Sequence, residues 1–231
     1  MLVAYASAPA ARRRRLIFFA VAFSALLLAG ESLRQNFSKS GQMSLAAAHC
    51  APQISFTAVD AMLPDWLFPL RLQVAAWRED LPAVRRLVQA RFRGVDHLGG
   101  DCAAETLNNP DIVLLDSREF DEYAVSRLPG AYWIDPHLEG EALAAELRDL
   151  TGGRPAVVYC SVGVRSAALI ERAQSALPPA EAARLRNLDG GLFHWANAGG
   201  ALETAAGEAP RVHGYNSAWG RLLAPSLRVQ E

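Results

Sequence analysis

Short apolar runs alternate with helix-like stretches from residue 95 onward, and this alternation limits the fold more than any other feature of the chain. The runs cover residues 111–116, 131–134 and 155–160, which are the lengths expected of buried strands, and we predict a fourth short strand at residues 184–188. The stretches between them carry apolar residues at helical spacing. Strands separated by helices are typical of a parallel sheet with right-handed crossovers. We therefore predict an α/β domain with a central parallel sheet flanked by helices.

The length of the chain, 231 residues, suggests one domain of ordinary size with extensions. We predict an amino-terminal hydrophobic segment over residues 1–30, a tether and helical extension over 31–94, the α/β domain over 95–205, and a tail over 206–231. The tail mixes proline, histidine, tyrosine and tryptophan. Aromatic side chains at this density are seldom solvated, so we expect the tail to pack on the domain.

The amino terminus has the pattern of an export signal. Four arginines, Arg12 to Arg15, precede an unbroken apolar segment over residues 16–29. This is a positive region followed by a hydrophobic region, and it fits either a cleaved signal peptide or an uncleaved membrane anchor. The arginines favour a cytoplasmic amino end, which predicts a periplasmic or membrane-anchored protein with its domain outside the cytoplasm. The alternative is that Met43 is the true start.

The clearest helix of the extension is predicted near residues 80–92. Asp80 has the character of an N-cap and Pro82 falls in the first turn, while Val84, Leu87, Val88 and Phe92 recur at helical spacing. Four arginines, at positions 85, 86, 91 and 93, occupy the other face. We interpret them as a solvated face. Contact with a membrane surface is the alternative.

Composition excludes several functions. The net charge of −1 gives no reason to expect nucleic-acid binding. No cluster of histidine, cysteine or acidic residues has the spacing of metal ligands, and no glycine-rich nucleotide-binding motif occurs, so we predict neither a metal nor a cofactor.

The three cysteines are Cys50, Cys102 and Cys160. In an oxidising compartment, Cys50 and Cys102 could form a disulfide and leave Cys160 as a free thiol. The alternative is that all three are reduced and that two of them are ordinary buried residues.

Cys160 is the candidate nucleophile. It ends a buried apolar run, and a short loop of small residues leads from it into a helix. Backbone N–H groups and the helix dipole stabilise an anion at such a place and lower the pKa of a thiol. Gly163 can take the positive φ that curls the loop around the sulfur. Arg165 opposes the dipole at the start of the helix, which suggests that an anion binds there.

Four motifs resemble those of the single-domain rhodaneses, in the family's order. They are the strand end at residues 114–119, the turn at 128–131, the cysteine loop at 160–166 and the closing Gly-Gly stretch at 188–195. The resemblance implies a rhodanese fold and sulfurtransferase activity. It implies that Cys160 accepts a sulfur atom as a persulfide, and that the loop binds the substrate through Ser161, Val162, Gly163, Val164, Arg165 and Ser166.

The implied reaction takes sulfur from a small anionic donor such as thiosulfate and passes it to cyanide or a thiol. Asp116 and Arg118, at the first strand end, are interpreted as structural supports of the site rather than catalytic groups. We expect Arg118 to form a salt bridge, with Glu119 as one candidate partner. The loop has no basic residue between Cys160 and Arg165, so thiosulfate preference is a weaker expectation than persulfide chemistry.

Two alternative functions remain open. Cysteine-dependent phosphatases and arsenate reductases place five residues between cysteine and arginine, whereas four separate Cys160 from Arg165. The shorter loop favours a sulfur atom over a phosphoryl group. A non-catalytic module or a slow persulfide carrier is the other alternative.

Overall fold

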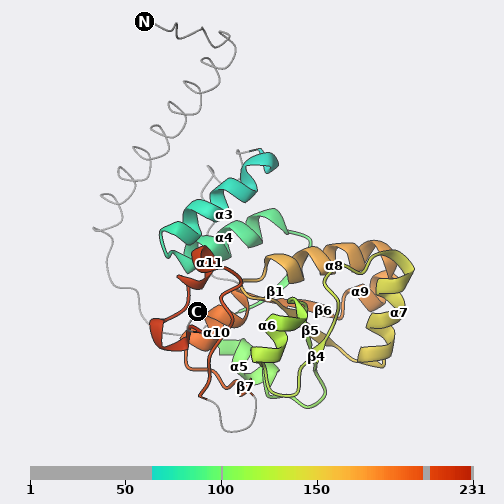
Figure 1. Ribbon diagram of the computed structural model, residues 1–231. Helices are drawn as coiled ribbons and strands as arrows, with labels where there is room; N and C mark the ends of the chain where they lie inside the picture. The colour runs from blue at the N-terminus through green and yellow to red at the C-terminus, as the bar shows by residue number, and fades with distance from the viewer. Residues whose placement is uncertain (1–63, 100, 205–208, 230–231) are drawn as a thin grey trace, which may run out of the picture. The chain divides into compact units, whose positions relative to one another are not determined.

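A five-stranded sheet forms the centre of the domain (Figure 1). The computed structural model describes residues 64–99, 101–204 and 209–229. The strand order is β1-β6-β5-β2-β4, and every pairing is parallel. The strands are β1 (Asp96–Leu98), β2 (Val113–Asp116), β4 (Tyr132–Trp133), β5 (Ala156–Tyr159) and β6 (Leu185–Leu188). The predicted α/β class with a parallel sheet is therefore confirmed.

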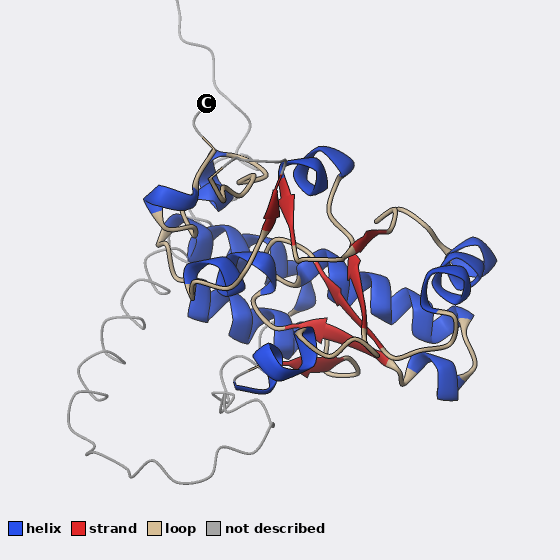
Figure 2. Ribbon diagram, turned by 90° about the horizontal axis from the view of Figure 1, so that it is seen from below, coloured by secondary structure: helices blue, strands red, loops and turns tan. Residues whose placement is uncertain are grey.

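Helices lie on both sides of this sheet (Figure 2). Helix α8 packs on β5 and β6, and α7 packs against α8. Along the chain the helices are α3 (Phe68–Trp77), α4 (Leu81–Arg91), α5 (Asp101–Leu107), α6 (Phe120–Val125), α7 (Gly140–Thr151), α8 (Val164–Ala176), α9 (Pro179–Ala182), α10 (Gly191–Asn197) and α11 (Ser217–Gly220). Short 3-10 turns, η1 (Asp65–Leu67) and η2 (Pro225–Leu227), complete them.

Helix α4 begins and is buried as its sequence predicts. The Asp80 carboxylate accepts a hydrogen bond from the backbone N–H of Ala83 at 2.9 Å, which is an N-cap. Val84, Leu87 and Val88 are buried in the core. The helix therefore belongs to the same hydrophobic core as the sheet.

The arginine face of α4 is not wholly solvated, and this corrects the interpretation made from sequence. The guanidinium of Arg85 donates to the buried carboxylate of Asp189, with Nη2 2.6 Å from Oδ2. Arg91 pairs with Glu171 of α8 at 3.2 Å, where both side chains are largely exposed. Helical periodicity identifies the polar face of α4. It does not show that one edge of that face packs against the rest of the domain.

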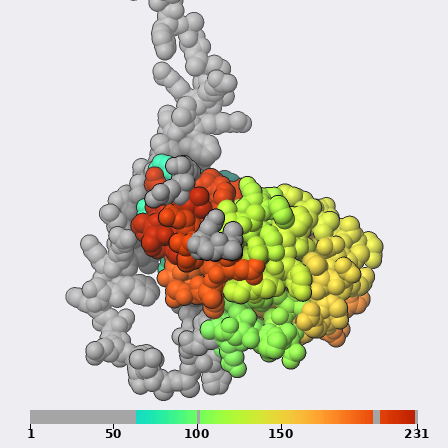
Figure 3. Space-filling model, turned by 60° about the horizontal axis from the view of Figure 1, so that its bottom comes forward, coloured from blue at the N-terminus to red at the C-terminus, as the bar shows by residue number. Residues whose placement is uncertain are grey.

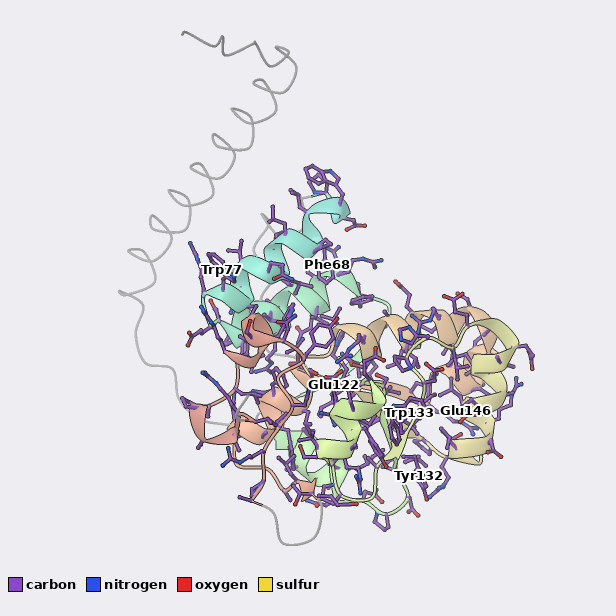
Figure 4. The ribbon with its side chains drawn as sticks, viewed as in Figure 1. Phe68, Trp77, Glu122, Tyr132, Trp133 and Glu146 are labelled. Atoms are coloured by element: carbon purple, nitrogen blue, oxygen red, sulfur yellow. The ribbon has the colours of Figure 1, made fainter. Side chains whose placement is uncertain are left out.

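Helix α3 has a different surface. Leu70 and Trp77 of α3, and Trp66 of the preceding turn η1, are exposed although they are large and apolar. Trp77 lies on the outer side of α3 in Figure 4. Within the described part of the chain, no helix is both long enough and apolar enough to cross a bilayer. The predicted hydrophobic segment, residues 16–29, lies outside the described residues.

A second, two-stranded sheet joins distant parts of the domain. Strand β3 (Ser126–Arg127) pairs antiparallel with β7 (Glu203–Thr204). An ion pair between Arg127 and Glu203 strengthens this contact. It ties the segment after α10 to the turn before β4.

The C-terminal residues 209–229 lie against the segment around α10 (Figure 3). The side chain of Asn197, the last residue of α10, donates to the carbonyl of Leu222 at 2.7 Å and accepts from the N–H of Ala224 at 2.8 Å. Leu222 and Leu223 are buried. A backbone bridge between Val212 and Arg228 closes the segment on itself.

Candidate active site around Cys160

Cys160 lies at the carboxyl end of β5, in the middle of the parallel sheet. Strand β5 is buried on both faces, and Cys160 itself is 1% exposed. The chain then turns through Ser161, Val162 and Gly163 into α8, which begins at Val164. Gly163 has φ +93°, and a β-carbon there would come within 3.3 Å of two neighbouring groups. Glycine is thus required for the turn that aims the loop at the sulfur.

The loop presents hydrogen-bond donors to the Cys160 sulfur. The N–H of Gly163 lies 3.2 Å from Sγ. Burial raises the pKa of this thiol, but the charge of Arg165 and hydrogen bonds from Ser166 and Val162 outweigh it. The net effect is a pKa below the ordinary value. The arrangement therefore stabilises a thiolate, which is the nucleophilic form of cysteine.

Arg165 is held by a buried carboxylate. Its Nη1 donates to Glu122 Oε2 at 2.6 Å and its Nη2 to Glu122 Oε1 at 2.9 Å. Glu122 is 1% exposed and lies on α6, toward the centre of the domain (Figure 4). The hydroxyl of Ser161 donates to the same carboxylate at 2.7 Å and accepts from Arg165 at 3.0 Å.

This pairing gives the charge at position 165 a partner within the fold. Burial raises the pKa of the Glu122 carboxyl, but hydrogen bonds and charge from Arg165 lower it by more, so the net direction is downward. The cation that the sequence analysis assigned to a bound anion is thus already paired with Glu122. Sequence reasoning missed Glu122, which lies in α6. Its position three residues after the helix N-cap, Glu119, was the available signal.

A buried polar network lies beneath the loop. The hydroxyl of Ser166 donates to Asn187 Oδ1 at 2.6 Å, and Asn187 Nδ2 donates to the Gly163 carbonyl at 3.2 Å. Asn187 Nδ2 also lies 3.0 Å from His97 Nδ1, while His97 Nε2 lies 3.1 Å from the Phe92 carbonyl. Because amide and carbonyl partners fix these roles, His97 carries its proton on Nε2. No motif in the sequence pointed to Asn187 or His97.

Helix α10 holds the carbonyl side of the loop. The N–H of Leu192 donates to the Cys160 carbonyl, and the N–H of Phe193 to the Ser161 carbonyl, both at 2.9 Å. Gly191, at φ +57°, makes this approach feasible, because a β-carbon there would lie 2.3 Å from the Cys160 oxygen. The carbonyls are thus turned toward α10, which leaves loop N–H groups for the sulfur.

Asp116 and Arg118 form a fully buried ion pair at the end of β2. Arg118 Nη2 lies 2.6 Å from Asp116 Oδ2, and its Nε also donates to the same carboxylate. Arg118 further donates to the Ser126 carbonyl. Arg118 thus pairs with Asp116 rather than with Glu119. Neither side chain has a hydrogen bond to the Cys160 loop among the contacts of the described residues.

Tyr215, from the C-terminal segment, lies over the guanidinium of Arg165. The Arg165 Cζ is 5.0 Å from the centre of its ring, the geometry of a cation–π contact. Tyr215 is 51% exposed and takes a left-handed backbone with φ +65°. The tail therefore contributes an aromatic face to the rim of the site.

The cysteines differ in state. Cys160 is a free thiol and Cys102, in α5, is disulfide-bonded. Its predicted partner, Cys50, lies outside the described residues, so that pairing stays a prediction.

Residues 101–198 match the family model of the rhodanese-like domain. No curated protein matches the chain significantly.

Solved structures give weaker likenesses. A thiosulfate sulfurtransferase from Pseudomonas aeruginosa is 26% identical, over 62% of this chain and 25% of that one, with a TM-score of 0.41. A Rhodopseudomonas palustris protein of unknown function, described as a possible tyrosine phosphatase, is 20% identical over 53% of this chain and 93% of that one, with a TM-score of 0.39. A rhodanese-related protein from Thermoplasma volcanium is 22% identical over 44% of this chain and 91% of that one, with a TM-score of 0.35.

Proposed function

Since the chain carries a rhodanese-like domain over residues 101–198, we propose that it is a sulfurtransferase that works through a persulfide on Cys160. The observation that carries the proposal is the environment of the Cys160 sulfur. It receives the Gly163 N–H at 3.2 Å and lies in the field of Arg165, so that its pKa is lowered although it is buried. A preformed thiolate needs no separate general base.

The first step is a displacement at sulfur. The Cys160 thiolate attacks the outer sulfur of a donor such as thiosulfate, a new S–S bond forms, and sulfite leaves with the electron pair of the broken S–S bond. The resulting persulfide anion carries its charge on the outer sulfur, where the loop N–H groups stabilise it.

The second step returns the enzyme to its first state. Cyanide or a thiolate attacks the outer sulfur, and the S–S bond to Cys160 breaks. The products are thiocyanate or a new persulfide, and the thiolate of Cys160 is regenerated. Splitting the transfer through a covalent intermediate is nucleophilic catalysis.

A persulfide carrier is the second candidate, and the burial of Cys160 favours it. A sulfur atom held at a site that is 1% exposed is protected from small nucleophiles in solution. Carrier and enzyme share the first step and differ in turnover. Phosphatase activity is less well supported, because both terminal nitrogens of Arg165 already bond Glu122 and four residues rather than five separate it from Cys160.

Intact mass spectrometry after treatment with thiosulfate tests the proposal. We expect a gain of one sulfur atom on Cys160, its removal by cyanide, and no gain in Cys160→Ser. Rapid thiocyanate production identifies an enzyme, whereas a stable persulfide with slow turnover identifies a carrier. An unchanged mass together with hydrolysis of an aryl phosphate would overturn both in favour of a phosphatase.

We propose further that the domain works outside the cytoplasm, in the periplasm or tethered to the membrane. Support comes from Arg12 to Arg15 and the apolar residues 16–29. The exposed Trp66 and Trp77 agree with a position near a membrane interface, where tryptophan is enriched. Fractionation of cells that produce the full chain tests this, and recovery in the cytoplasmic fraction contradicts it.

A further inference from the structure

Tyr215 reaches the Cys160 site from a segment outside the region that matches the family model. Residues 101–198 make up that region, and Tyr215 belongs to the C-terminal segment that follows it. The ring lies over Arg165, whose side chain is 26% exposed. Arg165 is also the charge that lowers the pKa of Cys160. The tail therefore touches the group that controls the nucleophile.

The backbone at Tyr215 is held in an unfavourable conformation. Its φ of +65° lies in the left-handed region, which a bulky residue seldom adopts. Such conformations persist only when the surrounding structure enforces them. At Tyr215, the backbone N–H donates to His213 Nδ1 at 3.1 Å, and the next residue, Asn216, caps α11 through its side chain.

The tail that imposes this conformation is itself anchored at several points. Asn197 bonds the backbone of Leu222 and Ala224, and the Arg228 guanidinium donates to the Leu223 carbonyl. Val212 is fully buried. These contacts fix the backbone on both sides of Tyr215, so the segment cannot move away from Arg165 without loss of other contacts.

Arg165 makes two kinds of contact. Its guanidinium nitrogens donate to Glu122 and to the Ser161 hydroxyl. Its Cζ also lies over the Tyr215 ring, 5.0 Å from the ring centre. Glu119 adds a weaker contact at 3.8 Å. The hydrogen bonds orient the guanidinium, whereas the neighbouring ring excludes water from it and so strengthens its attraction to a nearby anion.

We propose that Tyr215 is a positioning residue of the Cys160 site, holding the Arg165 guanidinium against Glu122 and screening it from water. The proposal rests on the proposed function, since this positioning matters only where Cys160 is the nucleophile. Loss of the ring exposes the cation, weakens its attraction to the thiolate and raises the pKa of Cys160. The charged or titratable groups around Arg165 and Tyr215 are Glu119, Glu122, His137 and His213.

The test measures alkylation of Cys160 by iodoacetamide in the full chain as a function of pH, with the modified peptide identified by mass spectrometry. Tyr215→Gly removes the ring, and glycine accepts the left-handed backbone without strain. Tyr215→Phe keeps the ring and should retain the pH profile of the wild-type protein. Tyr132→Ala removes a tyrosine of equal exposure, 52%, from the edge strand β4 and serves as the control.

We expect the alkylation rate of Tyr215→Gly, below the pKa of Cys160, to fall by about two- to fivefold, the range of an exposed cation–π contact. The profiles of Tyr215→Phe and Tyr132→Ala should match wild type. A Tyr215→Gly profile that superimposes on wild type overturns the proposal, as does a Tyr215→Phe profile shifted equally far. Alkylation does not require sulfur transfer. A shifted profile in a protein that takes no sulfur from thiosulfate would therefore reject the proposed function and leave the positioning role standing.

Discussion

Glu122 and Arg165 form a two-point ion pair, 2.6 and 2.9 Å long, that joins α6 to the start of α8 beside Cys160. The carboxylate is buried and the guanidinium is partly exposed. The pair has two roles. It gives Arg165 a fixed position from which its charge reaches the thiolate, and it connects two helices that flank the sheet.

Replacing Glu122 by glutamine should destabilise the fold. The variant keeps the shape but leaves the cation without its partner, and removing one member of a buried pair costs about 3 kcal/mol or more. We expect Glu122→Gln to lose about 2–3 kcal/mol of stability, because Arg165 is partly exposed to solvent. Urea denaturation measures this. Glu119→Gln is the matched control, since its carboxylate is exposed and 3.8 Å from Arg165, and its cost should stay below about 1 kcal/mol. Equal costs would contradict a special role for Glu122.

The same pair predicts loss of stability in acid. The pKa of Glu122 is held below its ordinary value of 4.5 in the folded protein. On acidification the unfolded chain therefore binds a proton on this group before the folded protein does. Its contribution is complete above pH 4.5 and is lost as the pH falls through the lower, folded pKa. Free energies of unfolding measured from pH 7 to pH 3 should fall less steeply in Glu122→Gln. Parallel curves would disprove the linkage.

Arg165 should control the reactivity of Cys160 toward alkylating agents. Arg165→Ala removes the main charge that favours the thiolate, so the pKa of Cys160 should rise and its alkylation near pH 7 should slow by about tenfold. Because the single variant leaves Glu122 unpaired, the double variant Arg165→Ala with Glu122→Gln shows whether the effect survives without that buried charge. Arg148→Ala, a surface arginine paired with Glu181, is the control. Wild-type reactivity in Arg165→Ala and in the double variant would exclude an electrostatic role for Arg165.

Asn187 should be more important for stability than its lack of charge suggests. Asn187→Leu has a similar volume but removes the partners of the Ser166 hydroxyl, the Gly163 carbonyl and His97 Nδ1, all of which are buried. Unsatisfied buried polar groups cost about 1–3 kcal/mol each, although relaxation reduces the sum. We expect a loss of about 3 kcal/mol in thermal or urea denaturation. A loss below about 1 kcal/mol would mean that the network contributes little.

Gly191 offers a test of the contact between α10 and the cysteine loop. Gly191→Ala forces a β-carbon to within 2.3 Å of the Cys160 carbonyl, so the helix or the loop must move. Gly152 has the same φ, +57°, but open space around it. Gly152→Ala therefore measures the backbone strain alone, about 1 kcal/mol. We expect Gly191→Ala to lose more stability than Gly152→Ala and also to lose sulfur uptake. Equal stability with full uptake would show that the close approach is unnecessary.

The sequence predicted well those elements whose pattern is local. The runs that became β2 and β5 are largely apolar and are buried along their whole length, which is typical of strands inside a parallel sheet. Gly152, which follows the last leucine of its helix, ends α7 in a left-handed cap, and a glycine in this place is a local signal that can be seen in the sequence. The edge elements were harder to predict. Strand β1 has three residues and β3 and β7 have two each, so no period can be recognised.

The residues of the candidate site likewise divide into those with a local sequence signal and those without one. Cys160 and Gly163 were recognised because a loop of small residues between a strand and a helix is itself a local signal. Glu122, Asn187 and Tyr215 were not recognised, because each acts across a contact between segments far apart in the chain. A charge that opposes the dipole at a helix start indicated that Arg165 has a partner, but not which one.

The hydrogen bonds from α10 to the carbonyls of Cys160 and Ser161 have a consequence for biosynthesis. The residues that shape the cysteine loop are made after it, on a helix that follows the next strand. A chain that has been synthesised only as far as α8 carries Cys160 without the groups that turn its loop toward the sulfur. We therefore expect the Cys160 thiol to reach its full reactivity only after α10 has packed on the loop.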